Sequence, residues 1–190
     1  MKTVSTWFIC GYQRRGALNK LLTSGALSFV LAFPLLSTGA SASSPVPASV
    51  ATVGSGELTW FGLSIYEATL YAPAGSFDPG DGYALRIDYN RTFSRSQLAK
   101  TSLKEMEKIF GDKADAEKII SRLEEVFCDV SKGDYIVGLH KPGQGAEFFC
   151  GDRAQGRLEN KELAAAFFAI WLNPATSAPK LRRQLLGLAP

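Results

Sequence analysis

Histidine and cysteine are scarce in this sequence of 190 residues, which contains one histidine and three cysteines. Structural zinc sites take four cysteine or histidine ligands, and these occur in clusters at short, regular spacings. The single histidine, His140, has no such cluster around it. We therefore expect neither a metal site nor a bound cofactor.

Acidic residues are absent from the first 42 positions, where four basic residues occur. An apolar run at residues 21–36 follows them, and Ala40-Ser41-Ala42 supplies the small residues that signal peptidase requires. This order predicts a cleaved signal peptide at residues 1–42 and a periplasmic or secreted mature protein without a membrane span. An uncleaved anchor is the alternative, but a run of about 16 residues is shorter than the roughly 20 that span a bilayer. Arg14-Arg15 leaves twin-arginine export open beside the general secretory route.

The predicted mature chain also lacks an excess of positive charge. The whole sequence carries a net charge of +3, from 21 basic and 18 acidic residues. Removal of the signal peptide takes away four basic residues and leaves 17 basic against 18 acidic residues. Nucleic-acid-binding domains carry a basic stripe or patch, and the mature sequence has none. We therefore exclude nucleic acid as a partner.

Two cysteines, Cys128 and Cys150, remain after the predicted cleavage. Two cysteines in an exported domain favour one disulfide between them, with two free buried thiols as the alternative. Cys128 closes a predicted helix and Cys150 ends a predicted hairpin. Because the second strand of a hairpin ends beside the start of the first, the two cysteines are expected to lie close together.

Several strands are predicted after an extended leader at residues 43–53. Residues 57–71 are rich in strand-forming side chains and contain Gly62, which predicts two strands or one bent strand. Residues 83–89 alternate between apolar and polar side chains, which predicts a strand with one buried face. A hairpin is predicted from strands at residues 135–140 and 146–150.

Helical spacing replaces this alternation after residue 93. Ser94 and Gln97 form a capping box ahead of the first helix, and Gly111 is expected to end it. Asp112 is expected to cap a second helix, whose apolar stripe continues to Val130.

Two further helices are predicted near the C-terminus. Asn160 is expected to cap a largely apolar helix that stops at Asn173-Pro174. A short last helix is expected to begin near Pro179 and to end before Gly187. The order of strands, helices, hairpin and helices indicates an α+β domain, with an antiparallel sheet covered on one face by helices.

Three segments resemble the bacterial members of the chalcone-isomerase-like family. They are GLSIYEATLY at 62–71, ALRIDYNR at 84–91 and FFAIWLNPATSAP at 167–179, of which the last is the most distinctive. The resemblance covers about residues 54–187 and places the domain at 54–190. It implies an open-faced β-sandwich of the chalcone isomerase type, in which helices on an antiparallel sheet leave a slot for an apolar ligand.

The resemblance also implies that the isomerase chemistry is missing. The plant enzymes use an arginine from the first strand, and this chain has Gly54 near that position and no arginine in residues 43–85. A reaction that gathers charge on an oxygen needs a cation or a strong donor there. The family's other catalytic positions fall at or near Tyr66, Leu98, Glu105 and Gln184, and none of these matches the enzymes.

Three residues are candidates for ligand binding: Tyr66, Tyr89 and Arg91. Tyr66 is a tyrosine in the fatty-acid-binding branch of the family as well, and its hydroxyl either meets a ligand or packs at the rim of the slot. Tyr89 and Arg91 share the core face if their strand continues that far. If the strand ends at Asn90 instead, Arg91 lies in an exposed turn.

The remaining side chains with polar or aromatic chemistry are expected to be structural. His140 is expected at the surface, because it ends a strand without an obvious partner. Seven aromatic residues are expected in the core: Trp60, Phe61, Phe148, Phe149, Phe167, Phe168 and Trp171.

These observations predict a periplasmic, non-catalytic protein that binds a small apolar or fatty-acid-like ligand. One alternative is an isomerase or lyase that acts on a substrate other than a chalcone and uses Tyr66, Tyr89 and Arg91. The other alternative is an interaction protein of the cell envelope. No pattern in the sequence specifies an oligomeric state.

Overall fold

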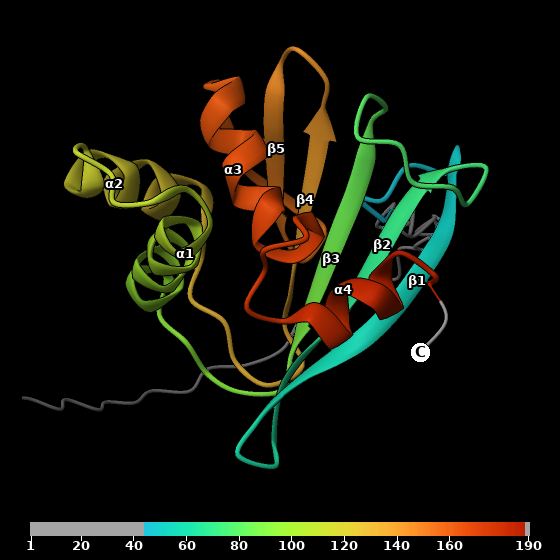
Figure 1. Ribbon diagram of the computed structural model, residues 1–190, viewed down its shortest axis with the longest axis horizontal. Helices are drawn as coiled ribbons and strands as arrows, with labels where there is room; N and C mark the ends of the chain where they lie inside the picture. The colour runs from blue at the N-terminus through green and yellow to red at the C-terminus, as the bar shows by residue number, and fades with distance from the viewer. Residues whose placement is uncertain (1–43, 189–190) are drawn as a thin grey trace, which may run out of the picture. The chain divides into compact units, whose positions relative to one another are not determined.

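A computed structural model describes residues 44–188, so the predicted signal peptide at residues 1–42 lies outside the described part of the chain. Six antiparallel strands form a sheet in sequence order, from β1 at one edge to β6 at the other (Figure 1). Their bounds are β1 Val50–Trp60, β2 Leu63–Pro73, β3 Tyr83–Tyr89, β4 Tyr135–Lys141, β5 Gly145–Cys150 and β6 Arg153–Leu158.

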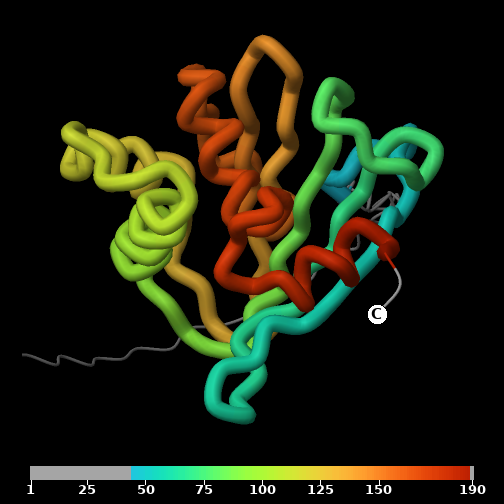
Figure 2. The backbone as a smooth tube through the Cα atoms, in the orientation of Figure 1, coloured from blue at the N-terminus to red at the C-terminus, as the bar shows by residue number. Residues whose placement is uncertain are grey.

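Helices cover one face of this sheet (Figures 1 and 2). The helix α3 packs on β5 and contacts α1, whereas α2 packs on β6 and α4 lies across β1. Their bounds are α1 Arg95–Phe110, α2 Ala116–Val126, α3 Lys161–Leu172 and α4 Pro179–Leu185. This arrangement confirms the predicted α+β fold, an antiparallel sheet with helices on one face. Within the described residues, no helix is long and apolar enough to cross a bilayer.

The first two strands form a hairpin that turns at Phe61 and Gly62. Both residues have positive φ, +48° and +75°, which is the geometry of the tight turns that join antiparallel strands. Of the two predicted alternatives, two strands or one strand bent at Gly62, the structure has two strands. The first strand begins at Val50, so it includes the last four residues of the predicted extended leader.

Two residues at the tip of this hairpin, Trp60 and Phe61, were predicted to lie in the aromatic core, and this prediction is wrong. Trp60 is 66% exposed and Phe61 is 86% exposed, because Trp60 ends β1 beside the turn and Phe61 belongs to the turn. Phe148, Phe167, Phe168 and Trp171 belong to the core as predicted, whereas Phe149 is only partly buried and is not part of the core.

The strand β3 has the predicted alternation. Tyr83, Leu85, Ile87 and Tyr89 are buried and belong to the main apolar core. Arg86 lies between them on the opposite face, where its guanidinium bonds Asp88 and covers the ring of Tyr135. The helices therefore pack on the apolar face of this strand.

The helix α1 begins with the predicted capping box. The Ser94 side chain accepts a hydrogen bond from the Gln97 amide, and the Gln97 side chain accepts one from the Ser94 amide. Gly111 follows the helix at a φ of +77°, which L-residues rarely adopt. The predicted start of α2 is wrong, because Asp115 and not Asp112 precedes its first turn. Asp115 accepts no capping hydrogen bond through its side chain, and Asp112 lies three residues further from the helix.

The edge strand β6 was not predicted. Its sequence, RAQGRL, has no apolar alternation, and Leu158 is its only buried residue. Gly156 allows the close approach of α2, because a Cβ at this position would lie 3.1 Å from a methyl carbon of Val126. This strand is thus specified by its pairing with β5 and its contact with α2 rather than by its own pattern.

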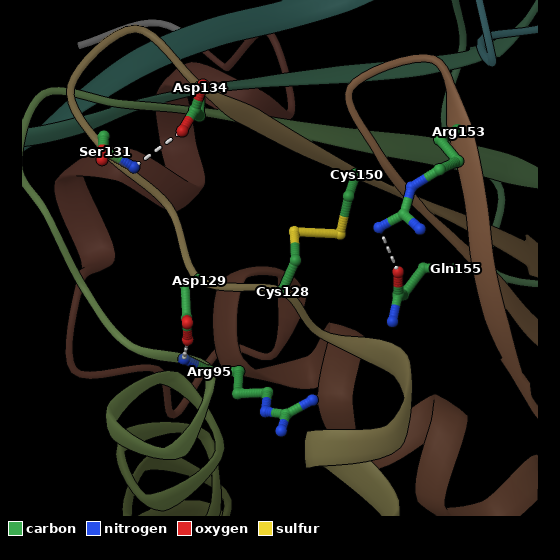
Figure 3. The surroundings of a disulfide bond; sticks show 8 residues. All are labelled: Arg95, Cys128, Asp129, Ser131, Asp134, Cys150, Arg153 and Gln155. Atoms are coloured by element: carbon green, nitrogen blue, oxygen red, sulfur yellow. Dashed lines mark hydrogen bonds between the residues drawn. A yellow bond between two sulfur atoms is a disulfide. The ribbon is translucent and has the colours of Figure 1, made fainter. Parts of the chain in front are cut away.

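The predicted disulfide joins Cys128 to Cys150 (Figure 3). Cys128 lies two residues after the end of α2, and Cys150 is the last residue of β5. The bond closes a sequence separation of 22 residues and ties the end of the helix to the sheet.

His140 is half-buried and not on the surface, which corrects the prediction for this residue. Its ring stacks on Tyr83 at 4.5 Å between centroids and meets the edge of Phe168. Burial lowers the pKa of His140, so the imidazole is neutral at neutral pH. The histidine therefore contributes to the packing at the end of β4, because its ring covers aromatic neighbours on the core side.

Candidate functional site

A cavity of about 220 Å³ lies between the sheet and the helices α1 and α3. Side chains from four neighbouring strands form its floor, and side chains from the two helices form its roof. Most of these side chains are aliphatic or aromatic, which is typical of sites that hold small molecules. The lining residues are Leu58, Ile65, Tyr66, Ile87, Tyr89, Phe93, Gln97, Leu98, Thr101, Ser102, Glu105, Phe127, Ile136, Phe167, Ile170, Trp171, Ser177 and Ala178.

Two of the predicted site residues, Tyr66 and Tyr89, lie in the wall of this cavity. They face each other on β2 and β3 as a register pair, and their rings meet edge to face with 6.2 Å between centroids. Trp171 on α3 donates its indole N–H to the Tyr66 hydroxyl at 2.8 Å. This bond fixes the orientation of the Tyr66 ring. The Tyr89 side chain is only 7% exposed.

Both tyrosines are protonated at neutral pH. Burial raises the pKa of Tyr66 to about 12, with an opposing contribution from the Trp171 hydrogen bond and a smaller one in the same direction from Glu105. Burial and the neighbouring Tyr66 also raise the pKa of Tyr89 above its ordinary value. The cavity therefore presents phenol groups that can donate a hydrogen bond.

The third predicted residue, Arg91, lies outside the cavity. The strand β3 ends at Tyr89, so the alternation that would carry Arg91 to the core face does not continue. Arg91 is exposed, and its guanidinium donates to the Ser64 carbonyl at 3.2 Å. This placement agrees with the alternative in which Arg91 lies beyond the end of the strand.

The polar part of the wall comes from one side of α1. Gln97, Thr101 and Glu105 follow each other at intervals of four residues, so they lie along one face of the helix. Glu105 accepts hydrogen bonds from Lys108 at 2.6 Å and from the Ser177 hydroxyl. Burial opposes the negative charge, but these two hydrogen bonds together with the positive charges of Lys108 and Lys104 lower the pKa of Glu105. The carboxylate is thus ionised at neutral pH.

No lysine, arginine or histidine occurs among the cavity-lining residues of the described chain. Near the position of the plant arginine, α4 packs so closely on β1 that a Cβ on Gly54 would lie 2.1 Å from the Gln184 carbonyl oxygen. A side chain at this position would therefore displace α4. The missing cation is a consequence of how this helix covers the first strand.

A larger depression of about 730 Å³ lies between α2, α3 and β6. Charged side chains, among them Lys113, Lys118 and Arg122, form much of its wall. It contains none of the predicted site residues. We therefore take the smaller, more aromatic cavity as the candidate site.

Sequence reasoning missed some of the polar residues in this site. Ser177 was not singled out, and Glu105 entered only as a mismatch to the plant enzymes. The spacing of Gln97, Thr101 and Glu105 was the available signal, because a polar row beside an apolar stripe marks the border of a packed helix face. Ser177 carried no such signal, since only the folded chain brings it to α1.

The sheet, the helix layer and the cavity between them define an α+β protein with an apolar site between its two layers. The chain belongs to the chalcone isomerase-like family, whose sequence model matches residues 52–187. This match confirms the resemblance found in the sequence.

Two similar proteins illustrate how far this relationship extends. An uncharacterised protein of Haemophilus influenzae is 26% identical over 136 residues, which cover 71% of this chain and 67% of that protein. A fatty-acid binding protein of Arabidopsis thaliana has a similar fold, with a TM-score of 0.55 over 74% of this chain and 88% of the plant chain. Its sequence identity is 12%, so this similarity concerns the fold alone.

Proposed function

We propose that this protein binds a small apolar ligand in the cavity between the sheet and the helices α1 and α3. The observation that carries the proposal is the composition of the wall, in which aliphatic and aromatic side chains surround two protonated tyrosines. An apolar body is favoured by burial against such a wall, and the phenol groups orient a polar end.

The size of the cavity and the structural relative support this proposal. The volume of about 220 Å³ is smaller than the roughly 300–1,000 Å³ of sites for drug-sized molecules, so the ligand is small or slender. The Arabidopsis protein with the similar fold is a fatty-acid binding protein, which is consistent with an apolar ligand here.

The proposal does not include catalysis. Chalcone isomerisation develops negative charge on an oxygen, and such a step depends on a cation or a preorganised set of donors. The cavity wall contains an ionised Glu105 and no cationic side chain among the described residues, so its charge is opposite to the one required. The raised pKa of Tyr66 also makes its phenolate a rare species at neutral pH.

Binding is testable with a neutral dye, N-phenyl-1-naphthylamine, whose fluorescence rises in apolar surroundings. We expect the purified protein to bind this dye saturably. The variant Leu98→Trp places a larger side chain in the cavity wall, so it should weaken dye binding by about tenfold or more.

Lys100→Trp is the matched control, because Lys100 is exposed on the same helix and does not line the cavity. This variant should bind the dye as the unaltered chain does. No saturable binding, or equal binding by the Leu98→Trp variant with its fold intact, would refute the assignment of the cavity.

We also propose that the mature protein is exported to the periplasm or secreted. The acid-free leader with its apolar run and Ala40-Ser41-Ala42 supports export, as does a disulfide in the folded domain. Fractionation of the producing cells and N-terminal sequencing should find a chain that begins at Ser43 outside the cytoplasm. A cytoplasmic chain with residues 1–42 intact would contradict export.

A further inference from the structure

The polar groups of the cavity differ from those expected for a carboxylate ligand. A site for a fatty-acid anion needs a cation or several donors at its head-group end. In the described residues, the only ionised side chain that lines this cavity is Glu105, which carries the same charge as a fatty acid. Two carboxylates in one small cavity repel each other, and each disfavours the ionised form of the other.

The cations closest to Glu105 do not change this conclusion. Lys108 pairs with one carboxylate oxygen at 2.6 Å, but its side chain is 46% exposed and lies outside the cavity wall. Lys104 acts on Glu105 only through its charge, and it is exposed as well. Both lysines therefore hold Glu105 ionised from the solvent side and offer no donor to a ligand inside.

The wall also contains the polar side chains of Tyr66, Gln97, Thr101 and Ser102, and two of its groups are of particular interest for the polar end of a ligand. The Glu105 carboxylate can accept further hydrogen bonds, because an ionised carboxylate has about four acceptor positions and only two donors occupy them here. Tyr89 also lines the cavity, and its protonated hydroxyl can donate one. A hydroxyl group on a ligand matches both, and an amino group matches Glu105.

We propose that this cavity selects apolar ligands with a hydrogen-bond-donating head, such as a long-chain alcohol or amine, and discriminates against carboxylates through Glu105. The inference rests on the proposed ligand-binding function and specifies the ligand class of the same site. This ligand class differs from the fatty acid that is named for the plant protein of similar fold.

The test compares 1-decanol, decylamine and decanoate as competitors of the neutral dye at pH 8, where decanoate is ionised. These molecules share one alkyl chain and differ in the head group. We expect decanol and decylamine to compete at concentrations about tenfold or more below that of decanoate. Glu105→Gln removes the charge at nearly constant shape, and it should reduce this preference for decanol to about threefold or less.

Glu107→Gln is the matched control on the same helix, since Glu107 is outside the cavity wall, and it should keep the preference of the unaltered chain. Lys108→Met provides a second variant that leaves the cavity wall intact. Removal of the positive charge of Lys108 should weaken the binding of decanoate further, and it should change the binding of decanol little.

The outcomes separate this inference from the proposed function. Decanoate that competes as well as decanol would overturn the inference and leave ligand binding in place. A preference that persists in the Glu105→Gln variant would overturn the role of Glu105. If neither the dye nor any of the three competitors binds, the proposed function and the inference are both wrong.

Discussion

At the scale of single residues, the Tyr66 hydroxyl connects two parts of the chain that are 105 positions apart. Trp171 donates its indole N–H to this oxygen, and the two rings form adjacent parts of the cavity wall. A buried donor that loses its partner costs about 1–3 kcal/mol. The hydrogen bond therefore stabilises the packing of α3 on the sheet and orients the wall of the site.

Replacement of Tyr66 by phenylalanine tests this role. We expect the free energy of unfolding of the Tyr66→Phe variant to fall by about 1–2 kcal/mol, because the indole N–H of Trp171 is left without a partner. Urea unfolding measures the change. Tyr71→Phe is the control on the same strand, since Tyr71 has no side-chain hydrogen bond among the described residues. Equal unfolding midpoints for the two variants would contradict the account.

The exposed hairpin tip leads to a prediction of the opposite kind. Phe61 is 86% exposed at a φ of +48°, a region that asparagine tolerates better than phenylalanine. Phe61→Asn should leave the free energy of unfolding unchanged or raise it slightly. Phe148→Ala should lower it by about 3–5 kcal/mol, because this ring is buried. Thermal unfolding distinguishes the two, and a large loss in the Phe61→Asn variant would show that the tip is packed against something.

Single residues were predictable from the sequence where a regular pattern continued, and not where it ended. Alternation placed Tyr89 on the core face of its strand correctly. The same alternation did not reach Arg91, because the end of a strand depends on its neighbours in the sheet. Phe61 was assigned to the core because its side chain is aromatic. It belongs to the turn between β1 and β2 instead, and it is exposed there.

At the scale of elements, the contact between α4 and β1 depends on the absence of a side chain at Gly54. A Cβ there would lie 2.1 Å from the Gln184 carbonyl oxygen, and a backbone atom in a helix has little freedom to move. The variant Gly54→Ala should therefore lose about 1–3 kcal/mol of unfolding free energy. Ser55→Ala is the control, because Ser55 is the exposed neighbour on the same strand.

Denaturant unfolding of these two variants checks the contact. Equal stability of the Gly54→Ala variant and the Ser55→Ala variant would contradict the close packing of α4. The comparison also bears on the site, since this packing leaves no space for an arginine on the first strand.

The disulfide also connects two elements, because it joins the end of α2 to β5. A cross-link over a separation of 22 residues stabilises by about 3 kcal/mol when it restricts the unfolded chain. The double variant Cys128→Ala, Cys150→Ala should lose about this amount in urea unfolding. Reduction of the unaltered protein should produce the same loss, and unchanged stability in both experiments would contradict the role of the bond.

Elements were predictable where local chemistry specifies them. The capping box before α1 and the Asn160 cap of α3 depend on residues a few positions apart, and both are present. The strand β6 has no local pattern, since it is defined by its hydrogen bonds to β5. The start of α2 was misplaced because the segment contains two aspartates, Asp112 and Asp115, and the one that precedes the helix forms no side-chain cap that would mark it.

At the scale of the whole molecule, the layers determine the site. The order of elements predicted the sheet and the helix layer, and the resemblance to a known family implied the slot between them. The charge of the slot was not predictable in the same way. It depends on which side of α1 faces the sheet and on Ser177, which only the folded chain brings beside Glu105.

The two tryptophans of the described residues provide the most direct test of the central claim, which is that an apolar ligand enters the cavity. Trp171 lines the cavity and Trp60 lies on the exposed hairpin tip, so their indole N–H signals report on the site and on the surface. The account predicts that ¹⁵N-tryptophan NMR during a titration with 1-decanol will shift the Trp171 signal saturably and leave the Trp60 signal in place. A Trp171 signal that stays unchanged, or a response confined to Trp60, would contradict it.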